Sequence, residues 1–120
     1  MIPTDLTLNQ TTRELTLTWD TGETHTLSCE FLRVYSPSAE VRGHGPGQEK
    51  LQVGKQNVNI VAIEPVGHYA VKLVFDDGHD SGLYDWKLLH DYGQNRDVYW
   101  SAYLAKLAAA GYSREKGARD

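Results

Sequence analysis

The stretch "RELTLTWDTGETHTLSC", residues 13–29, decides the first half of the fold. Every second residue of "LTLTW" is apolar, which predicts a strand with one apolar and one polar face. The segment "DTGE" is typical of a tight turn because Gly22 can adopt a positive φ angle, so we expect the chain to return as an antiparallel strand. Leu6 and Leu8 predict a further strand before this hairpin, and together the strands form an antiparallel meander.

A short helix is expected directly after the meander. Ser28 is a favourable N-cap, and the apolar residues of "CEFLRVYS" recur at helical spacing. Pro37 ends this helix, since the residue before a proline disfavours the helical conformation. Residues 36–57 contain two prolines and four glycines and are interpreted as one long loop. Loops of that length in compact domains are usually functional or mobile.

Regular structure resumes after the loop. Residues 58–63 and 69–75 are rich in β-branched and aromatic residues and apolar on both faces, which predicts that at least one of these strands is central in its sheet. The segment "FDDGHDSGLY" predicts a second hairpin. Asp77 and Gly78 are expected in its turn, and the return strand is expected to begin at His79.

Two helices are expected to close the chain. Asp85 should cap a helix over "WKLLHDYG" that Gly93 ends, and a last helix is expected over residues 97–110. The apolar stripe of this last helix is expected to consist of Trp100, Tyr103, Leu104 and Leu107. The sequence thus predicts a single α+β domain over residues 1–112, a largely antiparallel sheet with helices packed on it, and a disordered charged tail over residues 113–120.

The composition argues against several classes of function. The 120 residues carry a formal net charge of -4, and the Lys and Arg residues are spread along the chain, so nucleic acid is not expected as a partner. No apolar run approaches the about 20 residues that cross a bilayer. The N-terminal segment also lacks a signal-peptide pattern, and we therefore expect a cytoplasmic protein with no membrane partner.

Catalytic and cofactor motifs are missing from the sequence. It contains no nucleophile elbow, P-loop, dinucleotide fingerprint or H-E-x-x-H motif, so we expect no catalytic residue and no cofactor. Cys29 is the only cysteine, and one chain can therefore form neither an internal disulfide nor a site of several thiolates. Its apolar neighbours predict a buried structural thiol.

Metal binding is the more serious alternative, because the chain has five histidines and many aspartates. His44 and His79 lie in segments that could converge, and His79 lies among Asp76, Asp77 and Asp80. A metal site usually needs three or four ligands, however, and no pair of histidines here has the i, i+4 spacing that would preorganise one. We therefore interpret this segment as a solvated hairpin with turn-forming aspartates.

Aromatic side chains are concentrated in the second half of the chain. We expect most of them to belong to the core and some to line a groove, because aromatic residues are frequent at interaction surfaces. These residues are Tyr69, Tyr84, Trp86, Tyr99, Trp100 and Tyr103.

Four segments carry a family resemblance. They are "LTLTWDTGE", "LRVYSPSAEVRG", "VNIVAIEPVGHYAVKLVFDDGHDSGLYDWKLL" and the closing aromatic helix, and they extend over residues 6–111. In this order they resemble a domain of unknown function that is similar to the N-terminal domain of γ-butyrobetaine hydroxylase. That domain also occurs attached to P-loop proteins of iron-sulfur cluster assembly. The oxygenase chemistry of the hydroxylase resides in a separate domain, which this chain does not resemble.

The resemblance implies a zinc site whose ligands this chain lacks. In the hydroxylase branch, a Cys-Pro-Cys-x-x-Cys segment and a histidine from the later hairpin hold a structural zinc, and the matching positions here are Ser36, Ser38, Val41 and His79. Serine hydroxyls bind zinc poorly and valine does not bind it. We therefore expect no metal. Hydrogen bonds around Ser36, Ser38 and His79 are expected to join the loop to the hairpin instead, with Glu40 as a further acceptor.

These observations favour a non-enzymatic accessory module that binds another protein. Its expected contact surface consists of Arg33, Tyr35, Glu40, Arg42, His44, Asp77 and His79. A second hypothesis is a metal-handling factor linked to iron-sulfur cluster assembly, which would use Cys29, His44 or His79 as transient ligands. It would require a dimer, since clusters are normally held by several thiolates. A third hypothesis is a hydrolase that uses the carboxylates of residues 76–80.

Overall fold

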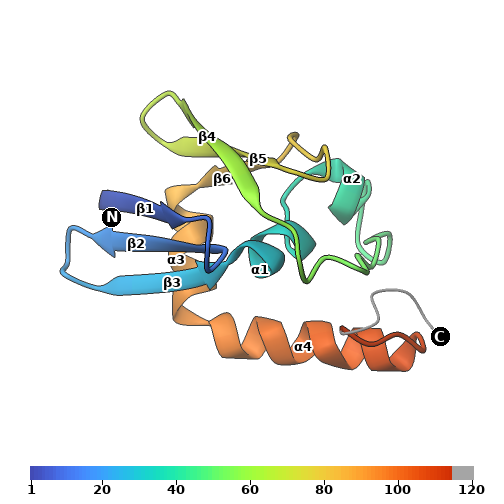
Figure 1. Ribbon diagram of the computed structural model, residues 1–120. Helices are drawn as coiled ribbons and strands as arrows, with labels where there is room; N and C mark the ends of the chain where they lie inside the picture. Colours follow the sequence, from blue (N-terminus) through green and yellow to red (C-terminus); the bar gives the residue numbers. More distant parts are fainter. Residues whose placement is uncertain (115–120) are drawn as a thin grey trace.

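The computed structural model of the chain describes residues 1–114, which form two three-stranded antiparallel sheets and four helices (Figure 1). The first sheet has the order β1-β2-β3, with β1 (Pro3–Asn9), β2 (Glu14–Trp19) and β3 (Thr24–Ser28). The second has the order β4-β5-β6, with β4 (Ile60–Val66), β5 (Ala70–Phe75) and β6 (Leu83–Asp85). The helices are α1 (Cys29–Val34), α2 (Ala39–Arg42), α3 (Trp86–Gln94) and α4 (Arg96–Ala109). The predicted α+β class is confirmed, and its strands divide into two sheets.

The N-terminal meander follows the alternation of its sequence. The apolar side chains of β2 are buried, whereas the threonines between them are only partly buried. Gly22 has a φ angle of +90° in the turn to β3, as that turn requires. Ser28 caps α1, because its Oγ accepts the backbone N–H of Phe31 at 3.0 Å. Every residue of α1 is buried, so this short helix is a central part of the core.

The second sheet differs from the predicted strands at two points. β4 continues through Pro65 because it is an edge strand, where a residue without an N–H group is tolerated. β6 begins at Leu83, not at His79 as predicted, because residues 76–82 leave the sheet and turn toward α2 (Figure 1). The expectation of a covered central strand is confirmed by β5, four of whose six residues are buried.

Helix α3 joins the two sheets. Asp85 caps it as predicted and accepts the N–H of Leu88 at 2.8 Å. Gly93 does not end the helix, which continues to Gln94. A Cβ atom at this position would overlap the ring of His25 on β3, so the glycine permits close packing of α3 on the first sheet.

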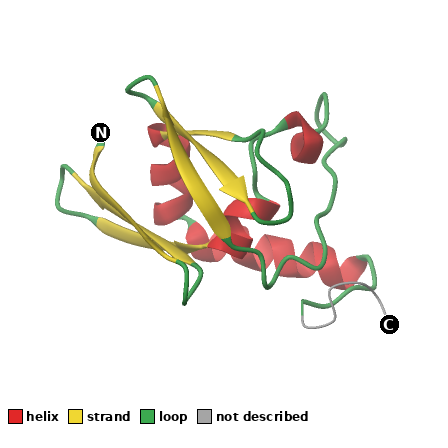
Figure 2. Ribbon diagram, turned by 45° about the horizontal axis from the view of Figure 1, so that its top comes forward, coloured by secondary structure: helices red, strands yellow, loops and turns green. Residues whose placement is uncertain are grey.

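Helix α4 packs along one side of the molecule (Figures 1 and 2). Tyr103 and Leu107 are buried and share a cluster with Val34 of α1. Leu104, which the predicted stripe included, is 39% exposed. It lies about 100° around the helix axis from Tyr103, so the buried face of α4 is narrower than the predicted stripe. Gly111 directly follows the end of the helix with a φ angle of +81°, as expected of a helix stop.

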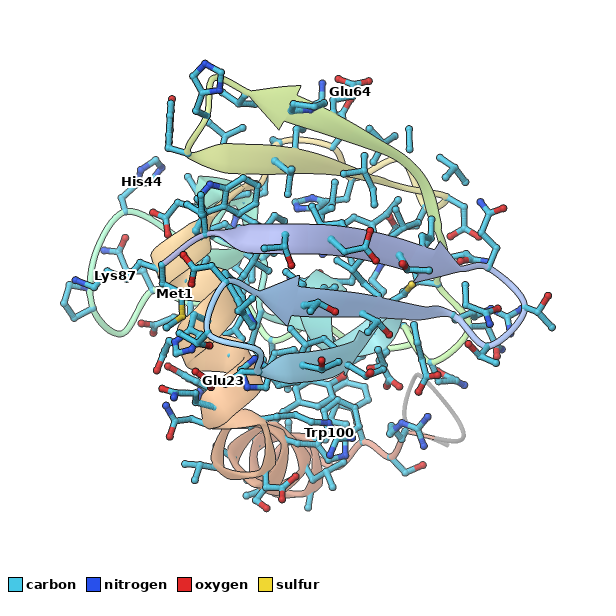
Figure 3. All side chains as sticks on the ribbon, turned by 90° about the vertical axis from the view of Figure 1, so that its left-hand side faces the viewer. Met1, Glu23, His44, Glu64, Lys87 and Trp100 are labelled. Atoms are coloured by element: carbon cyan, nitrogen blue, oxygen red, sulfur yellow. The ribbon has the colours of Figure 1, made fainter. Side chains whose placement is uncertain are left out.

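The predicted tail lies only partly within the described residues, since residues 115–120 are outside them. Arg114 is described: its Nε donates to Glu30 at 2.8 Å, and its guanidinium lies 5.7 Å from the ring centroid of Trp100. Burial raises the pKa of Glu30, and the hydrogen bond from Arg114 opposes that rise. Figure 3 shows Trp100 where α4 faces the first sheet.

One core joins both sheets with α1 and α3. Its buried residues come from β2, β3, β4, β5, β6, α1 and α3, together with Val58 just before β4. The long loop over residues 36–57 contains α2 and is otherwise irregular, and part of it runs between α2 and α4 (Figure 2). Among residues 1–114, no helix combines the length and the apolar character that crossing a membrane requires.

Candidate functional site: a polar clip beside a tyrosine-lined cavity

The segment that resembles the family's metal-binding block meets the loop over residues 76–82 in a polar cluster. We call this cluster the clip, and it consists of Arg33, Ser36, Ser38, Glu40, Asp77, His79 and Ser81. Local sequence places the first part of it. Pro37 follows α1, and Ser38 caps α2 by accepting the N–H of Glu40 at 3.1 Å.

The centre of the clip is a hydrogen bond between Ser36 and His79. Ser36 Oγ lies 2.8 Å from His79 Nε2 and also accepts the N–H of Ser38 at 3.2 Å. The tautomer of His79 decides which of these two groups donates the proton. Burial lowers the pKa of His79, and the charge of Arg33 lowers it further, so the neutral form is favoured.

A second set of hydrogen bonds ties α2 to the same loop. Ser38 Oγ lies 2.7 Å from Ser81 Oγ, and Ser81 in turn donates to the Glu40 carboxylate. His79 Nδ1 lies 3.8 Å from Glu40 Oε1, which is too far for a hydrogen bond. Glu40, the acceptor predicted for His79, therefore bonds to Ser81, and His79 bonds to Ser36.

Asp77 connects the loop to α1. Its carboxylate accepts from Arg33 Nε at 2.8 Å, from Lys55 Nζ at 2.7 Å and from the N–H of His79 at 3.2 Å. The Arg33 side chain is 9% exposed and that of Asp77 is 22% exposed. Burial alone would raise the pKa of Asp77, but its donors, Lys55 first, lower it to about 2.

The clip contains the elements of a catalytic triad without its geometry. Ser36, His79 and Glu40 stand in the order hydroxyl, imidazole, carboxylate, but Ser36 has an exposed fraction of 0%. A substrate carbonyl cannot reach its Oγ in this conformation. The carboxylate of Asp76, which the hydrolase hypothesis would use, accepts the backbone N–H of Asn59 at 3.0 Å.

The predicted contact surface divides into a buried and an exposed part. Arg33 is 7% exposed and His79 is 6% exposed, so both lie almost entirely below the surface. Both are enclosed because they bond to clip residues on the opposite segment. The exposed residues of the set are Glu40, Arg42, His44 and Asp77, and Tyr35 is half-buried.

The convergence of His44 with His79 that the sequence left possible is not found. His79 contacts Ser36, whereas His44 is exposed at the outer side of the loop, and its N–H bonds to the side chain of Gln48 at 3.2 Å (Figure 3). Cys29 is fully buried, as predicted, and burial raises its pKa. Within residues 1–114, no three His, Cys, Asp or Glu side chains are grouped so that they could hold a metal ion.

A cavity of about 500 Å³ lies beside the clip. We call it the tyrosine cavity, and its apolar and aromatic wall consists of Val34, Tyr35, Val41, Leu51, Leu88, Tyr92, Tyr99 and Tyr103. Ser36 of the clip also lines it. The cavity therefore shares a boundary with the clip but differs from it in its residue types.

Three phenol groups hold the wall in place. Tyr35 donates to the carbonyl of Tyr99, Tyr92 donates to that of Tyr35, and Tyr103 donates to that of Gln52, each at 2.7 Å. These bonds join α1 to α4, α3 to α1, and α4 to the long loop. Burial raises the pKa of Tyr103 to about 12, so its phenol stays neutral. The wall is thus preformed and presents uncharged aromatic rings.

Positive charge surrounds the mouth of the cavity. Arg42, Lys50 and Lys106 line it together with a single carboxylate, Glu49, and all four residues are exposed. Arg42 donates through Nη2 to the phenol of Tyr92 at 2.8 Å. None of the ion pairs within residues 1–114 involves any of the three cations.

Two features of the clip escaped the sequence prediction. Ser81 and Gly82 were assigned to a strand, but both belong to the loop that meets the Ser-Pro-Ser turn. A Cβ atom on Gly82 would lie 2.5 Å from Ser36 Oγ, so a glycine is needed for this approach. The Ser-Gly dipeptide after the hairpin was the available signal. The prediction that some aromatic residues line a groove is confirmed by Tyr99 and Tyr103, whereas Tyr69 is 60% exposed.

Comparisons with known proteins place the chain in a family. The model of the γ-butyrobetaine hydroxylase-like N-terminal family matches residues 6–90. One protein solved by NMR is 57% identical, with a TM-score of 0.80 over 94% of this chain and 84% of that chain. A second NMR structure is 50% identical, with a TM-score of 0.81 over 94% of this chain and 89% of that chain. No curated protein matches.

A crystal structure extends the comparison to a more distant relative. It is that of a protein of unknown function from Acidithiobacillus ferrooxidans ATCC 23270, which belongs to the DUF971 family. This relative is 36% identical, with a TM-score of 0.61 over 72% of this chain and 86% of that chain. The matched family model is that of the N-terminal domain, and the 120 residues contain no counterpart of the hydroxylase's catalytic domain. The match over residues 6–90 confirms the resemblance seen in the sequence, and this chain belongs to the γ-butyrobetaine hydroxylase-like N-terminal family.

Proposed function

We propose that this chain is a non-catalytic accessory module that binds another protein through the face formed by α2 and the tyrosine cavity. The observation that carries the proposal is a preformed aromatic wall beside Arg42, Lys50 and Lys106, which have no carboxylate partner among the described residues. Tyrosine and arginine are, with tryptophan, the residue types most enriched among the residues that dominate the binding energy of protein interfaces.

The chemistry of the two sites supports a non-catalytic role. Ser36 is closed to solvent, and His79 is held neutral against it. The described residues that line the cavity include no histidine, cysteine or aspartate. The one carboxylate of this lining, Glu49, is exposed, and burial keeps the phenol of Tyr103 neutral. A binding role therefore fits the cavity better than a catalytic one.

The metal-handling alternative has less support. A thiolate ligand needs a lowered pKa and access to solvent, whereas Cys29 is fully buried and its pKa is raised. Nε2 of His79 is already engaged in a hydrogen bond with Ser36. Only His44 of the three expected ligands is exposed. We further propose a cytoplasmic location, with which a single reduced cysteine is compatible.

Photocrosslinking in the native cell tests the proposed function. A photoreactive amino acid at His44, on the exposed loop beside α2, is expected to capture a discrete partner. The matched control is the same group at Val61 on β4, which is 53% exposed and lies neither on α2 nor on the loop that follows it. Identical products from both positions, or no product from the His44 position in cells where the chain is abundant, would contradict the proposal.

A further inference from the structure

The shape of the tyrosine cavity suits a side chain presented by a partner. Its volume of about 500 Å³ lies within the range of pockets that enclose small ligand groups, about 300–1,000 Å³. The bonds from Tyr35, Tyr92 and Tyr103 fix the wall from three elements before anything binds. A preformed pocket loses little conformational entropy on binding, so a single apolar anchor can contribute usefully to affinity.

The positive charge at the mouth of the cavity indicates which groups should flank the apolar anchor of the ligand. Arg42 comes from α2, Lys50 from the long loop and Lys106 from α4, so positive charge reaches the cavity from three directions. The chain as a whole carries a net charge of -4, which makes this region a local exception. Carboxylates on a ligand would be attracted to it, and electrostatic complementarity of this kind gives specificity.

Arg42 is positioned to donate hydrogen bonds to a carboxylate of the ligand. Its bond to the Tyr92 phenol uses one of the five N–H donors of the guanidinium and orients the planar group. The remaining donors can form the paired hydrogen bonds that carboxylates favour. Lys50 and Lys106 add mobile point charges, and their aliphatic stems extend the apolar surface of the mouth.

Resting on the proposed function, we infer that the tyrosine cavity is the docking site for an extended peptide segment of the partner, in which an aromatic or branched aliphatic residue is flanked by Asp or Glu. The apolar side chain occupies the tyrosine wall, and the flanking carboxylates contact Arg42, Lys50 and Lys106. An extended segment is favoured because the three cations lie on different elements around the mouth, where consecutive acidic residues can reach them.

A titration of the full chain with synthetic peptides tests this assignment. The probe is acetyl-Glu-Asp-Leu-Phe-Asp-Glu-amide, added to the isotopically labelled protein and followed by amide NMR shifts. Saturable shifts are expected at Tyr35, Leu51 and Tyr103, and none at Thr16 on β2. A peptide with Gln and Asn in place of the acids, and one with Ser in place of Leu and Phe, are each expected to bind at least about tenfold more weakly.

Variants of the protein separate a specific site from general attraction to charge. The double variant Lys50→Gln, Lys106→Gln is expected to weaken binding of the acidic peptide about tenfold, because it removes two positive charges at the mouth of the cavity. Both lysines are exposed, and neither takes part in an ion pair within residues 1–114. Lys72→Gln removes a positive charge on β5, outside the cavity, and is expected to leave binding within about twofold. Equal binding of the neutral peptide, or unchanged binding in the double variant, would overturn the assignment.

Binding of a small carboxylate, 3-phenylpropanoate, tests whether the cavity takes a peptide or a small molecule. If 3-phenylpropanoate bound as tightly as the acidic peptide and shifted the same amides, the cavity would be a small-molecule site and the peptide assignment would be wrong. If the peptide failed while the photoreactive group at His44 still captured a partner, the interaction module would stand with a different contact surface. Weaker binding of 3-phenylpropanoate than of the peptide supports the inference.

Discussion

The clip and the tyrosine cavity share a boundary at Ser36 but use their polar groups in opposite ways. In the clip, serine, histidine and carboxylate groups bond to one another across two segments, and buried polar groups need such pairing because each unpaired group costs free energy. At the cavity, the phenols bond to main-chain carbonyls, while exposed cations stay without carboxylate partners at little cost in water. The clip therefore serves to join two segments of the fold, whereas the cavity presents charged groups that are available to bind a partner.

The largest effect is expected from breaking the clip at Asp77. Asp77→Asn keeps the shape of the side chain but leaves the charge of Arg33, whose side chain is 9% exposed, without its carboxylate partner. We expect the free energy of unfolding to fall by about 2–4 kcal/mol, as for other broken, largely buried pairs. Urea denaturation measures the change.

Another aspartate of the same loop provides the control for this variant. Asp80→Asn removes an exposed carboxylate and should change the free energy of unfolding by less than about 0.5 kcal/mol. The pKa of Asp77 lies at about 2, below its ordinary value of 3.8, so its contribution is present above pH 3.8 and lost as the pH falls toward 2. Asp77→Asn should lack that acid transition. Equal losses in the two variants would contradict a special role for Asp77.

Local features of the fold were predictable because their causes are local. Alternation in β2 and the caps Ser28 and Asp85 depend on neighbouring residues alone, and all were predicted. Contacts between distant segments were not predictable in this way. Gly93 was expected to end α3, but what requires a glycine there is the His25 ring on β3. The division of the strands into two sheets likewise depends on packing across the core.

The two sites differ in how far the sequence could predict them. Ser36 and His79 were paired because the family resemblance aligned them with ligands of one metal, and the structure places them in contact. The tyrosine cavity had no comparable signal. Lys50 and Lys106 lie on the long loop and on α4, so no spacing in the sequence relates them, and only the aromatic residues indicated a groove.

A smaller effect is expected from His79, visible as a dependence on pH. Its folded-state pKa lies below the ordinary value of 6.5, so the unfolded chain takes up the proton first. The stability that this histidine contributes is therefore fully present above pH 6.5 and declines as the pH falls below it. His79→Gln should lower the free energy of unfolding by about 1 kcal/mol at pH 7.5 and remove this part of the decline.

The exposed histidine His44 is the matched control for the pH dependence. His44→Gln changes a side chain outside the clip and should leave the decline below pH 6.5 as in the wild type. Urea denaturation at a series of pH values compares the variants. A decline that persists in His79→Gln, or disappears in His44→Gln, would show that the clip does not cause it.

The smallest effect is expected when zinc is added to the wild type, because we expect it not to bind tightly. Hydrogen bonds among Ser36, Ser38 and His79 stand where the family resemblance implies ligands. The triple variant Ser36→Cys, Ser38→Cys, Val41→Cys would offer three thiolates beside the imidazole, which is a closed ligand set for zinc. We expect calorimetry to show one tight site in the triple variant and none in the wild type. Tight stoichiometric binding by the wild type would refute replacement of the metal by hydrogen bonds.

The most direct test of the contrast between clip and cavity measures stability and peptide binding on the same two variants. His79→Gln should lower the free energy of unfolding by about 1 kcal/mol and leave the affinity for acetyl-Glu-Asp-Leu-Phe-Asp-Glu-amide within about twofold. The variant Lys50→Gln, Lys106→Gln should weaken that affinity about tenfold and leave the free energy of unfolding within about 0.5 kcal/mol. If both variants lost stability and affinity together, the clip and the cavity would act as one site, which contradicts a structural joint separate from a binding surface.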